Sequence, residues 1–403
     1  MVEPTYPPIQ WERFLAQRMQ KMKNSAIREL LKITQQPDVI SFAGGLPAPE
    51  LFPVREIEEA CQYLLRHEPG QSLQYSTTEG YRPLREYLAE TMHKYGIPHH
   101  ADNILITTGS QQALDLIGKV FIDPGTYILT GRPTYLGAIQ AWRAYQAEFA
   151  TVPLDDDGMR VELIEEQLQK NPVRFIYVLP NFHNPAGTTL LTARRLQLVE
   201  IARKHDLIIV EDDPYGALRY EGSDLQPIAA LAPERTLYLG TFSKTLTPGV
   251  RVGWVAAPAD IAYRLVQAKQ GADLHSSTFD QMIVNDIAQR GILKVHVRRL
   301  RQVYGERRHT MLDALAEFWP SSCNWTHPQG GLFLWARVPD SIDTEPFLKQ
   351  ALKKKVAFVP GVNFYPYEQG GHNAMRLNFS KATTDQIVEG IHRLGLALKE
   401  QLR

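Results

Sequence analysis

Hydrophobic and polar positions change their spacing at about residue 53 of the chain. Before that point the pattern is irregular, except in segment 25–34, where four residues fall on one face and predict an amphipathic helix. From Arg55 onward, short and wholly apolar runs alternate with longer segments of helical period. Short apolar strands separated by helices indicate βαβ units, in which a sheet is covered on both faces.

The order of these runs predicts two domains. Region 259–318 has a helical pattern throughout, and strand-like runs return only after it. We therefore expect a large sheet domain over residues 54–290 and a smaller α+β domain over residues 291–403, which an N-terminal segment, 1–53, joins with its mobile helix. The predicted strands are 103–107, 127–130, 174–179, 207–211, 236–240, 252–257, 331–338 and 375–380, and the other predicted helices are 110–121, 136–145, 161–169, 193–204, 344–354 and 384–401.

Composition narrows the class of protein. The 403 residues include 44 Lys and Arg against 44 Asp and Glu, which argues against general binding to nucleic acid or anionic membranes. Cys61 and Cys323 are too few for a disulfide framework and lack metal-ligand spacing, so we expect a reducing compartment and no metal site. Because the sequence has no secretory pattern and no apolar run of ~18 residues, we expect a cytoplasmic protein.

Arginine is concentrated between residues 298 and 308. Such a cluster can mark a phosphate or nucleic-acid site, but these arginines are interleaved with Leu300, Val303 and Tyr304 at helical spacing. Because that spacing is typical of the solvated face of a long helix, we expect the arginines to face water. The cluster comprises Arg298, Arg299, Arg301, Arg307 and Arg308.

The most informative segment is 240–254, with the sequence GTFSKTLTPGVRVGW. Lys244 directly follows a predicted strand, and ligands of α/β proteins bind at the carboxyl ends of strands. Thr241 and Ser243 supply hydroxyls, and Arg251 supplies a guanidinium, for charge-assisted hydrogen bonds to a phosphate. A lysine beside a phosphate site is the arrangement that binds pyridoxal phosphate (PLP), whose aldehyde forms a Schiff base with a lysine amine.

Acidic and phenolic side chains follow another predicted strand, in the segment IIVEDDPYGAL. A carboxylate at the end of an apolar strand is costly to bury unless it is paired. Opposite a pyridine nitrogen, Asp212 would keep that nitrogen protonated and preserve the cofactor as an electron sink, while Tyr215 would reach its phenolic oxygen. Asp213 precedes Pro214, so we expect it to cap or turn the chain instead.

Three further segments suit the same cofactor. In TTGSQQALDL, Gly109 permits a tight turn and Ser110 is placed at the helix N-cap, so the N–H groups of Ser110 and Gln111 would face an anion. Asn184 lies in a turn before a proline and carries an amide that can donate to the phenolic oxygen. Tyr135 follows a strand, where its ring would either stack on the pyridine or pack in the core.

Arg376 lies within the apolar strand segment AMRLNF. An arginine in such a run is rarely buried without an anionic partner. In the absence of an internal acid, its natural partner is a substrate carboxylate bound through two parallel hydrogen bonds.

Together these segments resemble the PLP-dependent aminotransferases of fold type I, class I/II. Phrases spread over essentially the whole chain are similar to the α-aminoadipate aminotransferase / kynurenine aminotransferase II group. The resemblance implies an α/β fold with a mixed, mostly parallel seven-stranded sheet covered by helices, beside a smaller α+β domain. The phrases are SAIRELLK, SFAGGLPAPELFP, LQYSTTEGY, ITTGSQQALDL, GAIQA, LVQAKQGADLH and KVAFVPGVNF.

The resemblance also implies a role for each matching residue. Lys244 would form the Schiff base and then carry the proton, Asp212 would bind the pyridinium, and Tyr135 would lie on the ring face. Tyr75 would reach the phosphate of a neighbouring subunit, so the family implies a homodimer with shared active sites. The other cofactor contacts would be Asn184 and Tyr215 at the phenolic oxygen, and Ser110, Gln111, Thr241, Ser243 and Arg251 at the phosphate.

Substrate contacts follow from the same resemblance. Gly45, Asn184 and Arg376 match the site of the α-carboxylate. Arg28 corresponds to an arginine that can bind a distal carboxylate, although on its amphipathic helix it would equally well face water. His183 departs from the family pattern, and it would either alter the substrate pocket or be a satisfied structural residue.

The expected activity is transfer of an amino group from 2-aminoadipate, or another large or hydrophobic amino acid, to 2-oxoglutarate by a ping-pong mechanism. Other PLP reactions stay open, because a lyase, a decarboxylase or a racemase uses the same electron sink. A PLP-binding sensor domain of a transcription regulator requires an added helix–turn–helix module, for which we expect no room in the ~45 residues before the sheet domain.

Overall fold

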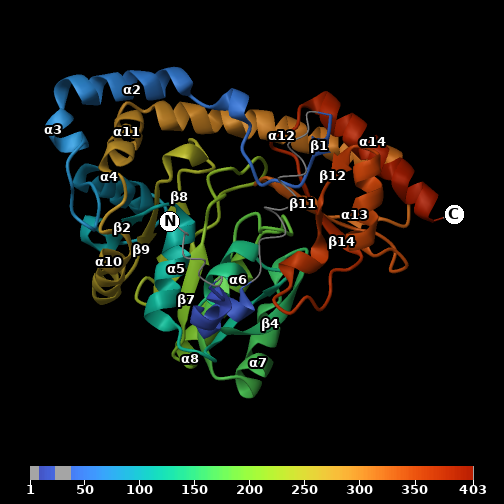
Figure 1. The fold of residues 1–403 in the computed structure, drawn as a ribbon, viewed down its shortest axis with the longest axis horizontal. Coiled ribbons are helices and arrows are strands. Elements are labelled where there is room, and N and C mark those ends of the chain that lie inside the picture. The colour runs from blue at the N-terminus through green and yellow to red at the C-terminus, as the bar shows by residue number, and fades with distance from the viewer. Residues whose placement is uncertain (1–8, 23–37, 403) are drawn as a thin grey trace, which may run out of the picture.

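The computed structural model describes residues 9–22 and 38–402 of the chain. The predicted helix 25–34, with Arg28, lies outside the described residues. Figure 1 shows the elements of a large sheet gathered with their helices in one part of the molecule, and the C-terminal elements gathered in another. Helix α12 (Ile292–Phe318) runs from one part to the other.

The large sheet is mixed and mostly parallel, and it has eight strands in the order β2-β9-β8-β7-β6-β3-β4-β5. The four central pairings, from β8 to β4, are parallel, and the pairings toward β2 and β5 are antiparallel. The strands are β2 (Ile104–Thr107), β3 (Tyr127–Arg132), β4 (Glu148–Asp155), β5 (Gly158–Met159), β6 (Val173–Val178), β7 (Ile208–Asp212), β8 (Thr236–Thr241) and β9 (Gly253–Ala256).

The expected strand count of seven is wrong by one. The extra strand, β5, has two residues and folds back on the end of β4, where Gly158 has a φ of +92° that favours glycine. A two-residue strand is too short to leave a recognisable alternation in the sequence.

Helices cover both faces of the large sheet, as the wholly apolar strands predict. Neighbouring residues of one strand enter opposite cores: Ile128 packs with α5 and α6, whereas Leu129 packs with α8. A third cluster joins β2 and β9 to α2, α4 and α11. The helices of this part are α2 (Val54–His67), α3 (Pro69–Ser72), α4 (Arg82–His93), α5 (Ser110–Phe121), α6 (Leu136–Arg143), α7 (Ile164–Lys170), α8 (Thr192–Lys204), α9 (Ile228–Leu231), α10 (Ala259–Asp273) and α11 (Thr278–Gln289).

The region 259–318 contains three helices, α10, α11 and α12, separated where Leu274 and Gly291 take positive φ angles. The expectation that the whole arginine cluster faces water is wrong for Arg307 and Arg308, which are 7% and 2% exposed. Their guanidinium groups pair with Glu50 and Glu221, which arrive from distant segments that the helical spacing cannot reveal. Arg298 and Arg299 are exposed as expected.

The smaller part contains a four-stranded antiparallel sheet in the order β10-β11-β14-β13. The N-terminal segment joins it, because β1 (Ile40–Ser41) pairs in parallel with β12 (Val356–Ala357) and Phe42 enters its core. The domain boundaries at residues 53 and 290 stay predictions. The other elements are β10 (Asn324–Trp325), β11 (Phe333–Arg337), α13 (Thr344–Lys353), β13 (Val359–Pro360), β14 (Ala374–Asn378) and α14 (Thr384–Gln401).

Among residues 9–22 and 38–402, no helix combines the length and the apolar character that crossing a bilayer requires.

Candidate active site

A cavity of about 260 Å³ opens at the carboxyl ends of β6, β7 and β8, and residues of β11, β14 and the N-terminal segment complete it. Its position agrees with the rule that α/β sheets bind ligands beyond the carboxyl ends of their strands. Twelve of the fourteen predicted site residues line it. They are Gly45, Ser110, Gln111, Tyr135, Asn184, Asp212, Tyr215, Thr241, Ser243, Lys244, Arg251 and Arg376.

Lys244 stands in the turn after β8, and its Nζ donates a hydrogen bond to the carbonyl oxygen of Gly45 at 2.8 Å. Burial, together with the positive charges of Arg376 and Arg251, lowers the pKa of Lys244 to about 8. The amine is therefore neutral in a larger share of molecules near neutral pH than a solvent-exposed lysine would be. A neutral amine is the form that attacks a carbonyl carbon.

Asp212 ends β7, with its carboxylate buried beneath the cavity. The hydroxyl of Tyr177 donates to Oδ2 at 2.8 Å, whereas Oδ1 accepts no hydrogen bond from the described residues. Burial raises the pKa of this carboxyl to about 7, and the bond from Tyr177 partly offsets the rise. A buried acceptor without a donor fits the protonated ring nitrogen of PLP, which brings the missing proton and a compensating charge.

Asp213 holds the turn, which is the role that its position before Pro214 predicts. Its Oδ1 accepts from the N–H of Gly216 at 2.9 Å, and its Oδ2 accepts from the hydroxyl of Tyr238 at 3.1 Å. Both oxygens are thus engaged in holding the turn, and Asp213 does not line the cavity described above.

Arg376 projects from β14 and is 2% exposed. Its Nη1 donates to Oδ1 of Asn184 at 2.8 Å, and its Nη2 donates to the carbonyl oxygen of Ala43 at 2.6 Å. The ring of Phe333 lies 4.2 Å from the guanidinium carbon. Among the described residues it forms no ion pair, and its Nε has no hydrogen-bond partner. Burial lowers the pKa of Arg376 to about 10, so the group remains charged and suited to a carboxylate ligand.

Asn184 bonds to both Arg376 and Tyr215. Tyr215 is the phenol expected beside Asn184 at the phenolic oxygen of the cofactor. Its Nδ2 donates to the hydroxyl oxygen of Tyr215 at 3.5 Å, while its Oδ1 is held by Arg376. Tyr215 is buried, with its ring edge against Phe333. The amide and the phenol therefore present two donors to the same side of the cavity.

The candidate phosphate site lies where α5, β9 and the loop 241–251 meet. Gly109 is the N-cap of α5 with a φ of +73°, so the prediction that Ser110 is the N-cap is wrong by one residue. Ser110 is the first helical residue, and its hydroxyl donates to the carbonyl oxygen of Gly240 at 3.4 Å. A Cβ on Gly253 would stand 2.8 Å from the main chain of Gly109, so glycine permits this close approach.

Two hydroxyls and a guanidinium complete this corner. Thr241 Oγ1 donates to Ser243 Oγ at 2.9 Å and accepts from its N–H at 3.1 Å. Arg251 takes a left-handed conformation, with a φ of +52°, and its Nη2 donates to the carbonyl oxygen of Thr108 at 3.3 Å. With the N–H groups of Ser110 and Gln111 in the first turn of α5, these groups form a positive corner that suits a phosphate.

Tyr135 and Gln111 border the cavity at the start of α6. A Cβ on Gly137 would stand 2.5 Å from the ring of Tyr135, so the phenol lies directly against that glycine. The side chain of Gln111 donates to the carbonyl oxygen of Gly137 at 3.0 Å. Both residues are therefore placed at the cavity wall, as predicted.

Two predicted site residues do not line this cavity. Tyr75 is 81% exposed, and the centroid of its ring lies 5.8 Å from the centroid of the His275 ring. Arg28 lies outside the described residues.

His183 is buried and does not line this cavity. Its Nδ1 accepts from the N–H of Ala186 at 3.3 Å, and burial lowers its pKa to about 3, so the ring is neutral.

Sequence reasoning missed Tyr177 and the apolar lining. Tyr177 sits in the buried, apolar part of β6, and the only clue to its role is that a buried phenol needs a hydrogen-bond partner. The other missed residues carry no chemical clue in the sequence. They are Leu179, Pro214, Pro248 and Phe333.

Comparisons with known proteins agree with this geometry. The model of the family described as aminotransferase class I and II matches residues 37–394. Aromatic-amino-acid aminotransferase 1 of Thermococcus litoralis is 47% identical to this chain over 98% of this chain and 97% of that protein.

Two solved structures are also similar. The kynurenine aminotransferase of Pyrococcus horikoshii, in complex with PMP, is 44% identical with a TM-score of 0.94, over 98% of this chain and 99% of that chain. The alpha-aminoadipate aminotransferase LysN of Thermus thermophilus, complexed with N-(5'-phosphopyridoxyl)-L-leucine, is 41% identical with a TM-score of 0.92, over the same shares of the two chains.

Proposed function

Because this chain belongs to the class I and II aminotransferase family, and is therefore a PLP-dependent aminotransferase, we propose that it exchanges amino groups between a large amino acid and 2-oxoglutarate by a ping-pong mechanism. The amino donor in this proposal is 2-aminoadipate or another large or hydrophobic amino acid. The observation that carries the proposal is one cavity lined by Lys244, Asp212 and Arg376. Among the described residues, one oxygen of Asp212 has no hydrogen-bond partner and Arg376 has no acidic partner.

In this proposal PLP, when bound, supplies the electron sink into which the substrate's Cα–H bonding electrons are withdrawn. Asp212 would hold the ring nitrogen, Asn184 and Tyr215 the phenolic oxygen, and Tyr135 the ring face. The phosphate would be held by Ser110, Gln111, Thr241, Ser243 and Arg251.

Lys244 moves the proton. Its pKa near 8 would let Nζ accept a proton from the Cα of the substrate and then donate a proton to a carbon of the bound cofactor. The bond from Nζ to the Gly45 carbonyl keeps the amine directed toward the N-terminal segment, on the side where Arg376 also lies. One flexible side chain thus serves as both proton acceptor and proton donor.

Arg376 orients the substrate. Its bonds to Asn184 and Ala43 and its contact with Phe333 fix the plane of the guanidinium before substrate arrives. A guanidinium fixed in this way binds a carboxylate through two parallel hydrogen bonds, and a fixed carboxylate sets the direction of the Cα–H bond. Gly45 would leave room for that carboxylate, since a Cβ there would stand 2.9 Å from Phe333.

The proposed substrate range follows from two features. Tyr135, Leu179 and Phe333 give the cavity an apolar wall that suits a large side chain. We assign to Arg28 the binding of the distal carboxylate of dicarboxylic substrates such as 2-aminoadipate. The names of the similar proteins, which mention aromatic amino acids, kynurenine and alpha-aminoadipate, are in keeping with a broad range.

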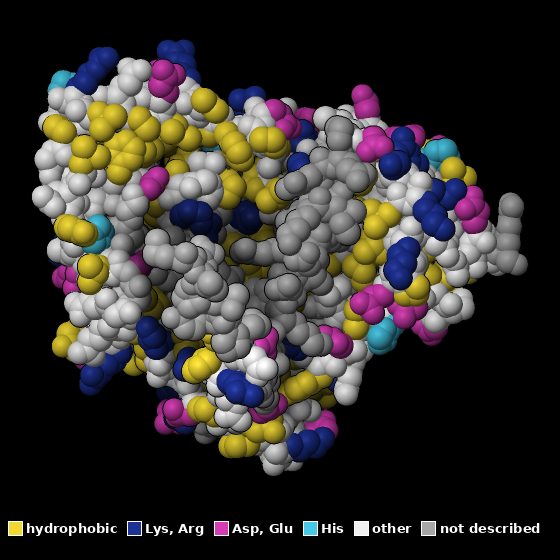
Figure 2. Space-filling view, in the orientation of Figure 1, with side chains coloured by type: hydrophobic (Ala, Val, Ile, Leu, Met, Phe, Trp, Pro, Cys, Tyr) yellow, Lys and Arg dark blue, Asp and Glu magenta, His cyan; other side chains and the backbone are white. Residues whose placement is uncertain are grey.

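The proposed working form is a cytoplasmic homodimer with shared active sites. Hydrophobic side chains gather over the α2–α3 end of the face shown in Figure 2. Large exposed apolar residues of this region include Val54, Leu65, Leu73 and Tyr75, which are 67%, 49%, 67% and 81% exposed. Contiguous exposed apolar surface favours an interface between copies, and Tyr75 lies at its edge, ready to reach a neighbouring subunit.

The direct test is a pair of half-reactions. Holoenzyme incubated with a donor alone should release one equivalent of 2-oxo acid per subunit and stop, and 2-oxoglutarate alone should then return it to the starting form. Initial rates with both substrates should give parallel double-reciprocal lines. Continuous turnover of the donor without any acceptor would instead indicate a lyase, a decarboxylase or a racemase, and would refute the proposal.

A further inference from the structure

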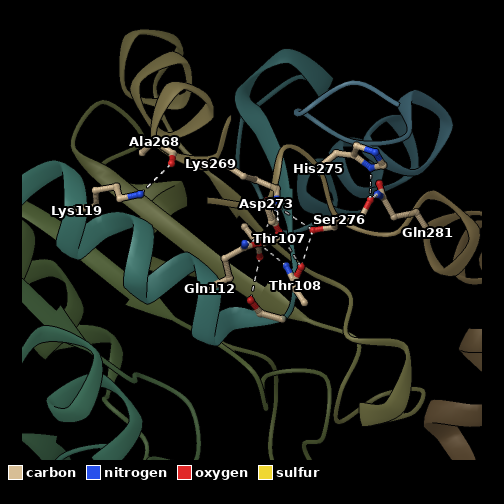
Figure 3. Close-up of polar contacts among 11 residues, drawn as sticks. Thr107, Thr108, Gln112, Lys119, Ala268, Lys269, Asp273, His275, Ser276 and Gln281 are labelled. Carbon is tan, nitrogen blue, oxygen red and sulfur yellow. Dashed lines mark hydrogen bonds and ion pairs between the residues drawn. The ribbon is translucent and has the colours of Figure 1, made fainter. Parts of the chain in front are cut away.

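Lys269 is a buried lysine that the proposed mechanism does not use. It lies in α10 with 0% of its surface exposed, behind the turn that leads into α5 (Figure 3). Its Nζ contacts both carboxylate oxygens of Asp273 at 2.7 and 2.8 Å, Oε1 of Gln112 at 2.8 Å and Oγ of Ser276 at 3.1 Å. The described chain thus supplies acceptors for all three ammonium protons.

These contacts fix the side chain of Gln112 at both ends. Its Oε1 accepts from Lys269 and from the main-chain N–H of Thr108 at 2.8 Å, and its Nε2 donates to Oδ2 of Asp273 at 2.6 Å. With one end bound to a cation and the other to an anion, the amide has a single orientation. The orientation matters because only its oxygen can accept from Thr108.

The same cluster holds Thr108, the residue before Gly109. Its hydroxyl bonds to Ser276 Oγ at 2.9 Å, and its carbonyl oxygen accepts from Nη2 of Arg251 at 3.3 Å. Lys269, Gln112 and Thr108 do not line the cavity itself. They therefore hold the main chain of the phosphate corner from behind, while the ring end of the cavity is built by other segments.

A buried ion pair of this kind is weak evidence for a stabilising role, because desolvating both charges offsets most of their attraction. An unbranched apolar side chain such as methionine would fill the same space without that cost. What methionine cannot do is orient Gln112, and so fix Thr108 and the free N–H groups that follow it. The network is suited to fixing a geometry rather than to adding stability.

We propose that Lys269 is a positioning residue that holds the turn before α5 and Arg251 in the geometry that binds the cofactor's phosphate. This inference rests on the proposed phosphate site at Ser110, Gln111 and Arg251. It predicts that loss of Lys269 weakens recognition of the phosphate and leaves recognition of the pyridine ring intact.

The test compares two ligands that differ only in the phosphate. Apo-protein is titrated with PLP and with pyridoxal, and binding is followed by the absorbance of the lysine-bound ligand. Lys269→Met should weaken binding of PLP at least tenfold and change binding of pyridoxal less than twofold. The control Lys119→Met removes a lysine of α5 that is exposed and donates only to the carbonyl oxygen of Ala268, so both affinities should stay unchanged.

A second variant keeps the test decisive if Lys269→Met fails to fold. Gln112 is only partly buried, and Gln112→Leu removes the bond to Thr108 while leaving Lys269 paired with Asp273. It should reproduce the phosphate-specific loss. Unchanged affinity for PLP in the folded variants, or an equal loss for PLP and pyridoxal, would overturn the proposal.

These outcomes are separate from failure of the proposed function. A wild-type protein that binds PLP more tightly than pyridoxal but fails the half-reaction test would refute the proposed reaction and leave the role of Lys269 standing. A wild type that exchanges amino groups while Lys269→Met retains full preference for PLP would refute the role of Lys269 alone.

Discussion

Tyr177 donates its hydroxyl hydrogen to Oδ2 of Asp212 at 2.8 Å, and the other oxygen of that carboxylate accepts no hydrogen bond from the described residues. The two residues come from neighbouring parallel strands, β6 and β7. The bond stabilises the carboxylate form in a site where burial raises the pKa of Asp212 to about 7. Tyr177 therefore controls how much of the apo-protein carries the charge that the ring nitrogen requires.

Tyr177→Phe should raise the pKa of Asp212 still further. Because PLP binding needs the carboxylate, affinity falls as the pH falls through this pKa, and the variant should show that fall at a higher pH. If the pKa rises by one unit from about 7, the ionised share at pH 7 falls from about one half to about one eleventh, so affinity at pH 7 should fall about fivefold. Titrations of the apo-protein with PLP between pH 6 and 8.5 measure the pH midpoint of this fall in affinity. Tyr238→Phe, which removes the hydroxyl bonded to Asp213, should leave the midpoint in place.

Lys244→Ala should abolish the absorbance of lysine-bound cofactor and reduce turnover by about 10²- to 10⁴-fold, since both the attacking amine and the proton carrier are lost. Lys244→Arg, which keeps a positive charge, should be equally inactive. In the wild type, the rate at which apo-protein captures PLP should rise as the pH rises through about 8, because the neutral amine is the reactive form. Full activity of either variant would remove the central assignment.

Arg376→Lys keeps the charge but loses the planar pair of donors, so it should raise KM for amino acids and 2-oxo acids. Losing a charge-assisted hydrogen bond costs about 1.5–3 kcal/mol, which corresponds to a decrease of about 10- to 150-fold in kcat/KM. A donor amine that lacks the carboxylate serves as the control, because its kcat/KM should change little. An equal loss for both kinds of donor would contradict the assignment.

Arg28→Ala separates two classes of substrate. If the guanidinium binds a distal carboxylate, activity should fall for 2-aminoadipate and glutamate and stay within about twofold for leucine and kynurenine. Lys32→Ala is the matched control, because Lys32 lies one turn further along the same predicted helix. A uniform effect across the substrate panel would show that Arg28 has no selective role.

His183→Asn tests whether this histidine is a buried structural residue. The folded-state pKa of about 3 lies below the ~6.5 of an unfolded chain, so only the unfolded chain gains a proton as the pH falls below ~6.5, and stability is lost there. The expected loss between pH 7 and pH 5 is about 2 kcal/mol from this residue. Asparagine keeps an acceptor for the N–H of Ala186 and does not titrate, so its variant should lose about that much less. Urea unfolding of the apo-protein at fixed concentration, at both pH values, measures the difference.

Much of the fold follows from local pattern alone. The central strands are short, mainly apolar runs, and successive residues such as Ile128 and Leu129 are buried on opposite faces, as expected for a sheet covered on both sides. Helix α14 begins and ends where its period predicts, at Thr384 and Gln401. The two-residue strand β5 and the breaks at Leu274 and Gly291 could not be predicted, because they depend on single backbone angles.

The chemistry of the site can also be predicted from the sequence, because each group lies at a strand end or in a short loop with a characteristic spacing. Lys244, Asp212 and Arg376 are recognisable from these positions, whereas the reaction class is implied by the resemblance to the aminotransferases. Tertiary structure alone decided which groups meet. Gly45 and Lys244 bond across 199 positions, Tyr177 reaches Asp212 from the next strand, and Lys269 bonds to Gln112 of α5, 157 positions before it. The physical reason is that hydrophobic periodicity reports which face of an element is covered, whereas the partner covering it is chosen by the packing of the whole chain.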